Sequence, residues 1–373
     1  MSFPHRILIA CDKFKGSLSA DEANAAIARG MAKRFPRAGI EHRLMADGGE
    51  GFVSAAAAAL TGDWIETTAH DALGRRIPAR YLIAEHGGER LAFIEMAEAS
   101  GMWRIAREER DILRSSTFGT GELMRHAIEV QRADRLIVGL GGSATNDGGA
   151  GMAAALGVRF LDTEGNEIRP LPLDLSERLA VADASTALRM PPVIAACDVT
   201  NPLLGPNGAT RIYGPQKGAD ENTIQVLESA LARLVETSDG WKEAEKPGAG
   251  AAGGLGFGLM RFCGAELRSG FDMIADLTGL EKAVGRADLV ITGEGSLDAQ
   301  SLSGKGPVSL ARMARRLGKR VIAFCGAADV AVKEAACFDE IIELRSTGLP
   351  LDVLLTRAAE LLESLAADED LPS

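Results

Sequence analysis

A glycine-rich segment, GGSATNDGG, begins at Gly141 and combines residues that suit a phosphate with residues that suit a metal ion. It follows an apolar run at 136–138 and precedes a stretch of small residues, so the pattern predicts a strand, a turn and a helix. Such a turn exposes backbone N–H groups that bind phosphate. Asn146 and Asp147 within it suit a hydrated Mg²⁺ better than a bare phosphate. The segment therefore indicates phosphoryl transfer.

Further polar, glycine-rich loops follow other predicted strands. They are DKFKGS (12–17), ADGGEG (46–51), CDVTNPLLGPNG (197–208) and GEGSLDAQSLSGK (293–305). In open parallel sheets, ligands bind beyond the carboxyl ends of the strands. Any one loop is equally well explained as an ordinary turn, with glycine at positive φ and Asp or Ser as a helix cap. Together, loops that carry Asp, Asn, Lys and Ser favour a binding site.

The charged residues of these loops have separable roles in a kinase. Lys15 and Lys305 each lie beside a glycine and are suited to neutralise a phosphate or a substrate carboxylate. A kinase needs one or two carboxylates for Mg²⁺ and can use another to take the proton of the acceptor hydroxyl. We assign Asp47, Lys15 and Asp198 as catalytic, with Asp47 the first choice for the acceptor proton.

The loops offer two alternatives for the metal and two for the phosphates. Mg²⁺ is held either by Asp198 with Asn201 or by Asp147 with Asn146. The phosphates bind the backbone N–H groups of 141–149 or of 293–296, and the residues assigned to them are Gly141, Gly142, Ser143, Gly293 and Gly295.

Both ends of the chain predict the same architecture. Strands at 6–10 and 40–46 alternate with helices that end near 34 and at 60, and Ser19 with Glu22 forms a capping box at the first helix. The C-terminal part predicts strands at 287–292, 320–325 and 340–344, with helices at 308–317 and 351–366. This alternation is typical of an α/β protein with a parallel sheet and right-handed crossovers.

The middle of the chain differs. It predicts strands at 75–84, 90–96, 136–140, 158–161 and 193–197 and an amphipathic helix at 223–237. We therefore expect a discontinuous domain of residues 1–70 and 284–373, an inserted domain of residues 71–283, and an active site in the interdomain cleft.

Composition narrows the classes of partner. The net charge of −11 argues against nucleic acid or an anionic membrane as partner. No apolar stretch approaches the ~18 residues of a membrane span. The five cysteines show no CxxC spacing, which favours reduced thiols and a cytoplasmic location, and the histidines show no metal-binding spacing. Whether the protein is a monomer or a homodimer stays open.

Two other functions compete with a kinase. GLGGSA (139–144) nearly matches a dinucleotide-binding fingerprint and favours an NAD(P)-dependent oxidoreductase, although Asp147 would repel a pyrophosphate there without a cation. A non-catalytic sensor of nucleotides or sugar acids would use the same loops without turnover. The classical phosphate loop GxxxxGK[ST] is absent from the sequence.

Taken together and in order, these motifs resemble the class I glycerate kinases. The resemblance runs from about residue 9 to 306 and also includes IEMAEASG, STFGTGEL, YGPQKGA and GAGAAGGLGFG. The family often begins with APDSFKGS where this chain has ACDKFKGS, so Lys13 adds a positive charge near the site.

The resemblance implies ATP- and Mg²⁺-dependent phosphorylation of D-glycerate, most often to 2-phosphoglycerate, with 3-phosphoglycerate as the alternative product. It also implies a three-layer, Rossmann-like α/β domain interrupted by a second, smaller α/β domain. For such a substrate we assign Ser17, Lys305 and Asp298 to glycerate binding.

Overall fold

The computed structural model describes residues 4–46, 48–298, 301–303 and 306–368. The chain forms two compact units, Met1–Ala46 with Phe271–Ser373 (unit 1) and Asp47–Gly270 (unit 2). The sequence instead predicted the boundaries between the two domains at 70/71 and 283/284. Residues 48–70 lie in unit 2 because helix α2 (Phe52–Ala59) and strand β3 (Gly62–His70) pack and pair with its sheet. The inserted unit, expected to be the smaller, is the longer of the two.

Unit 1 is built on a five-stranded parallel sheet of order β13-β12-β11-β1-β2. Its strands are β1 (Arg6–Ile9), β2 (Gly39–His42), β11 (Leu289–Leu297), β12 (Arg320–Ala328) and β13 (Glu340–Glu343). Buried side chains alternate between the two faces of the sheet, as the pleat requires. Ile7 and Ile9 point into one core, whereas Leu8 and Ala10 point into the other.

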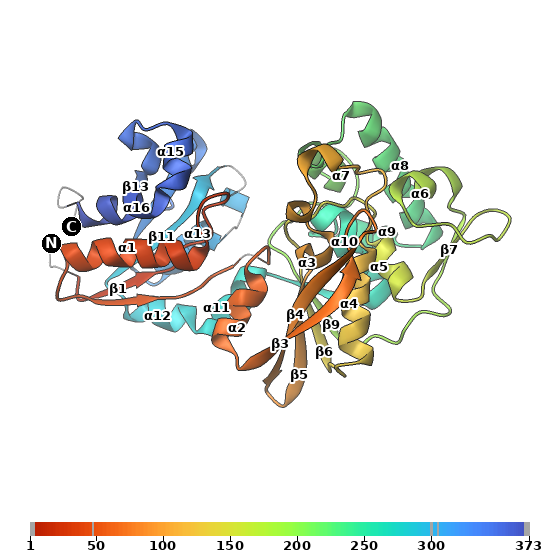
Figure 1. Cartoon of the computed structure of the whole chain (residues 1–373), viewed down its shortest axis with the longest axis horizontal. Coiled ribbons are helices and arrows are strands. Elements are labelled where there is room, and N and C mark those ends of the chain that lie inside the picture. The colour runs from red at the N-terminus through yellow and green to blue at the C-terminus, as the bar shows by residue number, and fades with distance from the viewer. Residues whose placement is uncertain (1–3, 47, 299–300, 304–305, 369–373) are drawn as a thin grey trace. The chain divides into compact units, whose positions relative to one another are not determined.

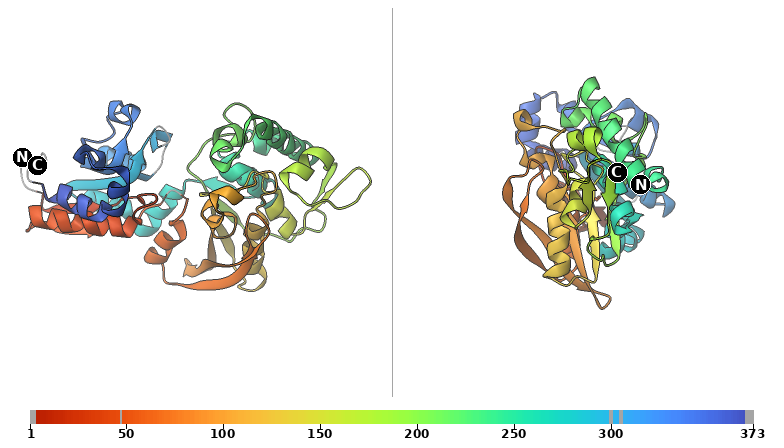
Figure 2. Two further views of the ribbon diagram at one scale, coloured as in Figure 1. Left: turned by 45° about the horizontal axis from the view of Figure 1, so that its top comes forward. Right: turned by 90° about the vertical axis from the view of Figure 1, so that its right-hand side faces the viewer.

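Helices cover both faces of this sheet, which gives the expected three layers. One face carries α1 (Ala20–Arg34) and α16 (Ala358–Ala367), the first and last helices of the chain, which lie side by side (Figures 1 and 2). The other face carries α11 (Gly270–Thr278), α12 (Leu280–Arg286), α13 (Gly306–Arg316) and α14 (Val330–Glu334). Helix α15 (Leu351–Thr356) precedes α16. The predicted capping box at Ser19 and Glu22 is present at the start of α1.

Unit 2 contains a six-stranded mixed sheet of order β10-β9-β6-β5-β4-β3. Its remaining strands are β4 (Arg76–His86), β5 (Glu89–Glu95), β6 (Arg135–Gly139), β9 (Val193–Ala196) and β10 (Glu266–Arg268). Strands β5, β6, β9 and β10 are parallel, whereas β3 and β4 extend the sheet as an antiparallel pair. The carboxyl ends of β5, β6 and β9 therefore meet at one edge.

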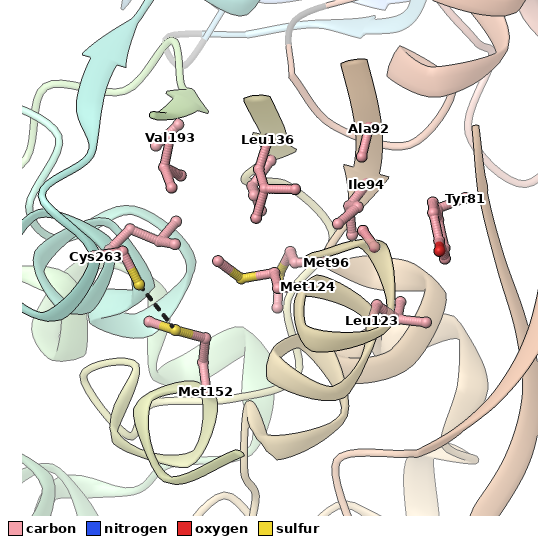
Figure 3. Close-up of a cluster of buried hydrophobic side chains, with 14 of the residues drawn as sticks. Tyr81, Ala92, Ile94, Met96, Leu123, Met124, Leu136, Met152, Val193 and Cys263 are labelled. Carbon is pink, nitrogen blue, oxygen red and sulfur yellow. Dashed lines mark hydrogen bonds between the residues drawn. The ribbon is translucent and has the colours of Figure 1, made fainter. Parts of the chain in front are cut away.

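The main core of unit 2 lies on one face of this sheet. It is covered by α3 (Ala97–Ser100), α4 (Phe118–Glu129), α5 (Ala150–Ala155) and α10 (Ala251–Cys263). Figure 3 shows a row of sheet residues facing helix residues across this core: Tyr81, Ile94, Leu136 and Val193 opposite Leu123, Met124 and Met152. Alternate residues such as Phe93 face the other side, where α2 packs with the Phe52 ring 6.4 Å from that of Phe93.

A further layer packs on the outer side of α5 and α10. It consists of α6 (Pro172–Arg178), α7 (Ala209–Tyr213), α8 (Glu221–Thr237), α9 (Trp241–Ala244) and the antiparallel pair β7 (Arg159–Leu161) and β8 (Val181–Asp183). Among the described residues, no helix is long and apolar enough to cross a membrane.

Candidate active site

In unit 2, the loops that follow β5, β6 and β9 all leave the sheet at its carboxyl edge, where ligands bind in open α/β sheets. A fourth segment, 48–51, lies against the same edge. A Cβ atom added to Gly48 would lie 2.6 Å from the carbonyl oxygen of Ala196, and one added to Gly141 would lie 2.3 Å from the Cα of Gly49. Gly48 and Gly141 are therefore required, because three backbone segments approach one another too closely here for a Cβ atom.

Glu95, the last residue of β5, holds this fourth segment in place. Its Oε1 accepts hydrogen bonds from the backbone N–H groups of Gly51 at 3.0 Å and Val53 at 2.9 Å, at the start of α2. Asp47, the predicted base, lies outside the described residues, so its role stays a prediction. Glu95 was not singled out from the sequence, although its position at a strand end was the available signal.

The turn after β6 presents unpaired backbone donors. Among the described residues, no hydrogen-bond acceptor is present for the N–H groups of Gly141, Gly142 and Ser143, whereas the N–H of Ala144 donates to the carbonyl of Ser100. Gly142 is exposed and has a φ of +68°. Consecutive free N–H groups around a left-handed residue form a concavity suited to an anion. This geometry supports the predicted phosphate contacts of these three residues.

The same turn does not have the geometry of a dinucleotide-binding fingerprint. In that motif the helix opens directly at the glycines, whereas here α5 begins only at Ala150. Asp162 follows a later strand, where such a motif would place an acidic residue to bind the ribose. Its carboxylate instead accepts hydrogen bonds from the N–H groups of Glu164 and Asn166 in a tight turn.

Asp147 is fully buried and is surrounded by donors from its own protein. Its carboxylate accepts from Thr117 N at 2.7 Å, Thr117 Oγ1 at 2.8 Å, and the N–H groups of Gly149 and Gly151 at 3.1 Å. Burial raises the pKa of Asp147, and these hydrogen bonds oppose that shift. The carboxylate thus joins the starts of α4 and α5. Asn146 is also fully buried, with its Nδ2 donating to Thr210 Oγ1 at 3.0 Å.

Asp198 has a different environment. It follows β9 at the carboxyl edge and is half-buried. Its predicted companion Asn201 is engaged within its own loop, since its Nδ2 donates to the carbonyl of Asn207 at 2.8 Å and its Oδ1 accepts from Tyr213 Oη at 2.7 Å. Of the two carboxylates predicted to bind a metal in unit 2, Asp198 is the more accessible.

The donor set of unit 2 is compatible with Mg²⁺ at a single carboxylate. Within the described ranges, no three His, Cys, Asp or Glu side chains gather closely enough to hold a metal ion by themselves. Mg²⁺ in phosphoryl-transfer sites retains waters and is held by one or two carboxylates together with the substrate phosphates. Asp198 meets this requirement, whereas the four donors around Asp147 occupy that carboxylate.

Unit 1 gathers a second set of predicted residues at the carboxyl ends of β1 and β11. Lys15 is exposed in the turn after β1, and a Cβ atom on Gly295 would lie 3.0 Å from its backbone nitrogen. The Ser17 hydroxyl donates to the carbonyl of Leu355 at 2.5 Å. Asp298 accepts from the N–H of Ser301, which is fully buried and donates through its hydroxyl to Glu294 at 2.7 Å. Lys305 lies outside the described residues.

The sequence was wrong about the backbone at Gly293 and Gly295. It predicted a loop after residue 292, but β11 continues to Leu297 and pairs with β12 through Leu297 and Ala328. The glycines are needed because the neighbouring strand is close: a Cβ atom on Gly293 would lie 2.0 Å from the carbonyl oxygen of Phe324. Phosphate binding by Gly293 and Gly295 stays a prediction, although these two residues lie in a strand and not in the turn from which it was predicted.

Lys217 was given no role from the sequence, but the structure places its side chain inside the candidate site. Its buried ammonium donates to the carbonyl of Thr145 at 2.7 Å and to Ser143 Oγ at 3.1 Å, inside the turn after β6. Its position beside a glycine in GPQKG was the available signal, shared with Lys15 and Lys305.

Comparison with known proteins identifies the relatives of this chain. The model of the glycerate kinase family matches residues 7–368. A glycerate kinase of Bacillus subtilis (strain 168) is 42% identical over 371 residues, covering 97% of this chain and 96% of that protein. A glycerate 2-kinase of Escherichia coli (strain K12) is 44% identical over 329 residues, covering 86% of this chain and 85% of that protein.

A solved structure agrees with these matches. The crystal structure of a protein provisionally named glycerate kinase 2, from Salmonella typhimurium LT2, superposes with a TM-score of 0.78 at 40% identity. The superposition covers 98% of this chain and 97% of that one.

Proposed function

Because this chain belongs to the glycerate kinase family, we propose that it transfers the γ-phosphoryl group of ATP to the 2-hydroxyl of D-glycerate. The name of the E. coli relative, glycerate 2-kinase, supports the 2-position. Transfer to the 3-hydroxyl needs the same parts and differs only in how the glycerate carboxylate is held. The structural observation that carries the proposal is the turn at 141–143, whose free N–H groups lie at the carboxyl edge of a parallel sheet.

In this mechanism the side chains and backbone groups of the loops divide the tasks of phosphate, metal and substrate binding. The N–H groups of Gly141, Gly142 and Ser143 bind a nucleotide phosphate, and Asp198 would hold a Mg²⁺ ion, which would supply positive charge against the phosphates. Lys15 neutralises charge on the transferred group or binds the glycerate carboxylate, with Ser17, Lys305 and Asp298 as further glycerate contacts. Asp47 takes or orients the proton of the acceptor hydroxyl.

The experiment that tests these roles is an ADP-release assay in which ADP formation must depend on D-glycerate. Phosphoryl transfer relies on positioning and charge stabilisation, so Asp198→Asn, Lys15→Ala and Asp47→Asn should each lower kcat by ~10²–10³-fold. Lys242→Met, which removes an exposed lysine of α9, is the control and should leave kcat unchanged. If all three site variants keep near-normal turnover, the site is misplaced. EDTA should abolish turnover, and added Mg²⁺ should restore it.

A further inference from the structure

Lys217 places a cationic side chain in the interior of unit 2. It ends a short 3-10 helix (Pro215–Lys217), and the residue is only 3% exposed. Both acceptors of its Nζ are neutral: the carbonyl of Thr145 and the hydroxyl of Ser143. Among the described residues, no carboxylate forms an ion pair with it. Burying an ammonium group that has no ion-pair partner is costly, which lowers the pKa of Lys217 from its ordinary value.

The hydrogen bonds around Ser143 show what this lysine does. Ser143 Oγ accepts from Lys217 Nζ at 3.1 Å and from the N–H of Thr145 at 3.1 Å. A hydroxyl has two acceptor lone pairs and one proton. With both lone pairs occupied, Ser143 can act only as a donor toward a third partner. The acceptors within reach of its proton are Thr145 Oγ1 at 3.1 Å and the carbonyl oxygen of Thr145 at 3.3 Å.

The lysine also fixes the backbone of the turn. By binding Ser143 and the carbonyl of Thr145 together, it closes the three-residue segment 143–145, which directly follows Gly141 and Gly142. On the other side of the turn, the carbonyl of Gly142 accepts from the N–H of Met102 at 2.8 Å. The turn is therefore held from both sides while its donors stay available.

We propose that Lys217 is a positioning residue for phosphoryl transfer: it acts through Ser143, so that the Ser143 hydroxyl and the N–H groups of 141–143 are presented together as donors to one phosphate group of the nucleotide. This inference rests on the proposed function of the turn as the phosphate-binding element. On phosphate binding, the Ser143 proton turns from Thr145 to a phosphate oxygen, while Lys217 and the Thr145 N–H keep both lone pairs occupied.

The proposal is tested with the full-length protein by a double-mutant cycle of Lys217→Met and Ser143→Ala. Each single variant should lower kcat on the order of 10²-fold, as loss of a preorganised donor does, while KM for D-glycerate changes by less than about threefold. Because both residues act through one contact, the double variant should be little worse than either single one. Lys217→Arg, which keeps a charged donor, should recover part of kcat, and Lys242→Met is the control for loss of a lysine.

A binding experiment tests the role of Lys217 separately from the proposed function. Calorimetry with inorganic tripolyphosphate should give a dissociation constant about tenfold weaker for Lys217→Met than for the wild type, whatever the acceptor substrate. Wild-type protein that binds tripolyphosphate but makes no glycerate-dependent ADP would refute the proposed function alone. Equal tripolyphosphate affinity in the two proteins, or additive losses of kcat in the double variant, would overturn the role of Lys217. If Lys217→Met does not fold, a Ser143→Ala variant with normal kcat and tripolyphosphate affinity overturns it instead.

Discussion

Asp147 and Asp198 are both aspartates of the glycine-rich loops, but their surroundings give them different roles. Asp147 is fully buried and accepts four hydrogen bonds from the starts of two helices, whereas Asp198 is half-buried at the end of β9. The sequence offered both as metal ligands. The hydrogen bonds of Asp147 hold the turn, and the proposed role of Asp198 in binding Mg²⁺ stays a prediction.

Replacing Asp147 by asparagine should therefore mainly reduce stability, whereas replacing Asp198 by asparagine should mainly reduce activity. Asp147→Asn places an amide N–H₂ against groups that are themselves donors, so the free energy of unfolding should fall by about 3 kcal/mol, the scale of a lost charge-assisted bond. Asp198→Asn should reduce kcat and should lower stability by less than Asp147→Asn does. Urea unfolding and steady-state kinetics on both variants measure these effects. A stable Asp147→Asn variant that needs more Mg²⁺ would show that Asp147 is the metal ligand after all.

Lys217 should make stability depend on pH. Burial lowers its pKa to about 7, with the charge of Asp147 opposing that shift, whereas the unfolded lysine has a pKa near 10.5. Between these values the unfolded chain binds a proton that the native protein does not, so this group's contribution to stability rises with pH, by up to about 1.4 kcal/mol per unit. The free energy of unfolding of the wild type, relative to Lys217→Met, should increase from pH 7 to 10. A difference that stays constant over this range would mean that Lys217 remains charged in the native protein.

At the scale of elements, the start of α10 supports the turn after β6 through an unusual backbone. Ala252, Gly253 and Gly254 all have positive φ, and the carbonyl of Gly253 accepts from the N–H of Gly148 at 3.1 Å. A Cβ atom on Gly253 would lie 1.9 Å from the carbonyl oxygen of Thr145, the same oxygen that Lys217 binds. The helix start and the turn therefore fit only with glycine at this position.

Two glycine substitutions separate this contact from backbone strain alone. Gly253→Ala should cost at least about 3 kcal/mol and lower kcat, because the strain of positive φ and a backbone clash add at one position. Gly264 has a similar φ, +64° against +66° for Gly253, but nothing lies within 4 Å of its added Cβ, so Gly264→Ala should cost only about 1–2 kcal/mol. Thermal unfolding and turnover of both variants test this. Similar losses in the two would show that the close contact with Thr145 does not matter.

The sequence predicted most elements because apolar runs mark buried parallel strands, and it predicted the strand-end loops from their glycines and polar residues. It missed β3, whose side chains are mostly exposed or half-buried at the edge of the sheet. It ended β11 too early because glycine marks a turn and a close strand approach equally well. The role of Asp147 depends on Thr117, 30 residues away, and that of Lys217 on Ser143, 74 residues away. Such partners are set by packing and leave no local pattern.

At the scale of the whole molecule, the reactivity of the cysteines measures how well the cores of both units are buried. Cys11 and Cys325 in unit 1 and Cys263 in unit 2 are buried, and burial raises the pKa of each thiol. Cys197 and Cys337 are half-buried. Because the thiolate is the reactive form, a thiol-specific reagent should modify at most these two in the native protein and all five after denaturation. Mass spectrometry of the labelled peptides identifies them. Rapid native labelling of Cys11, Cys263 or Cys325 would contradict the described cores.

The proposed phosphorylation of D-glycerate can be observed by ³¹P NMR of the protein with ATP, Mg²⁺ and D-glycerate. We expect a new phosphomonoester resonance that coincides with added 2-phosphoglycerate, together with the resonances of ADP. A resonance that coincides with 3-phosphoglycerate would keep the kinase and reverse the assigned hydroxyl. Unchanged ATP in the presence of folded protein would contradict the account.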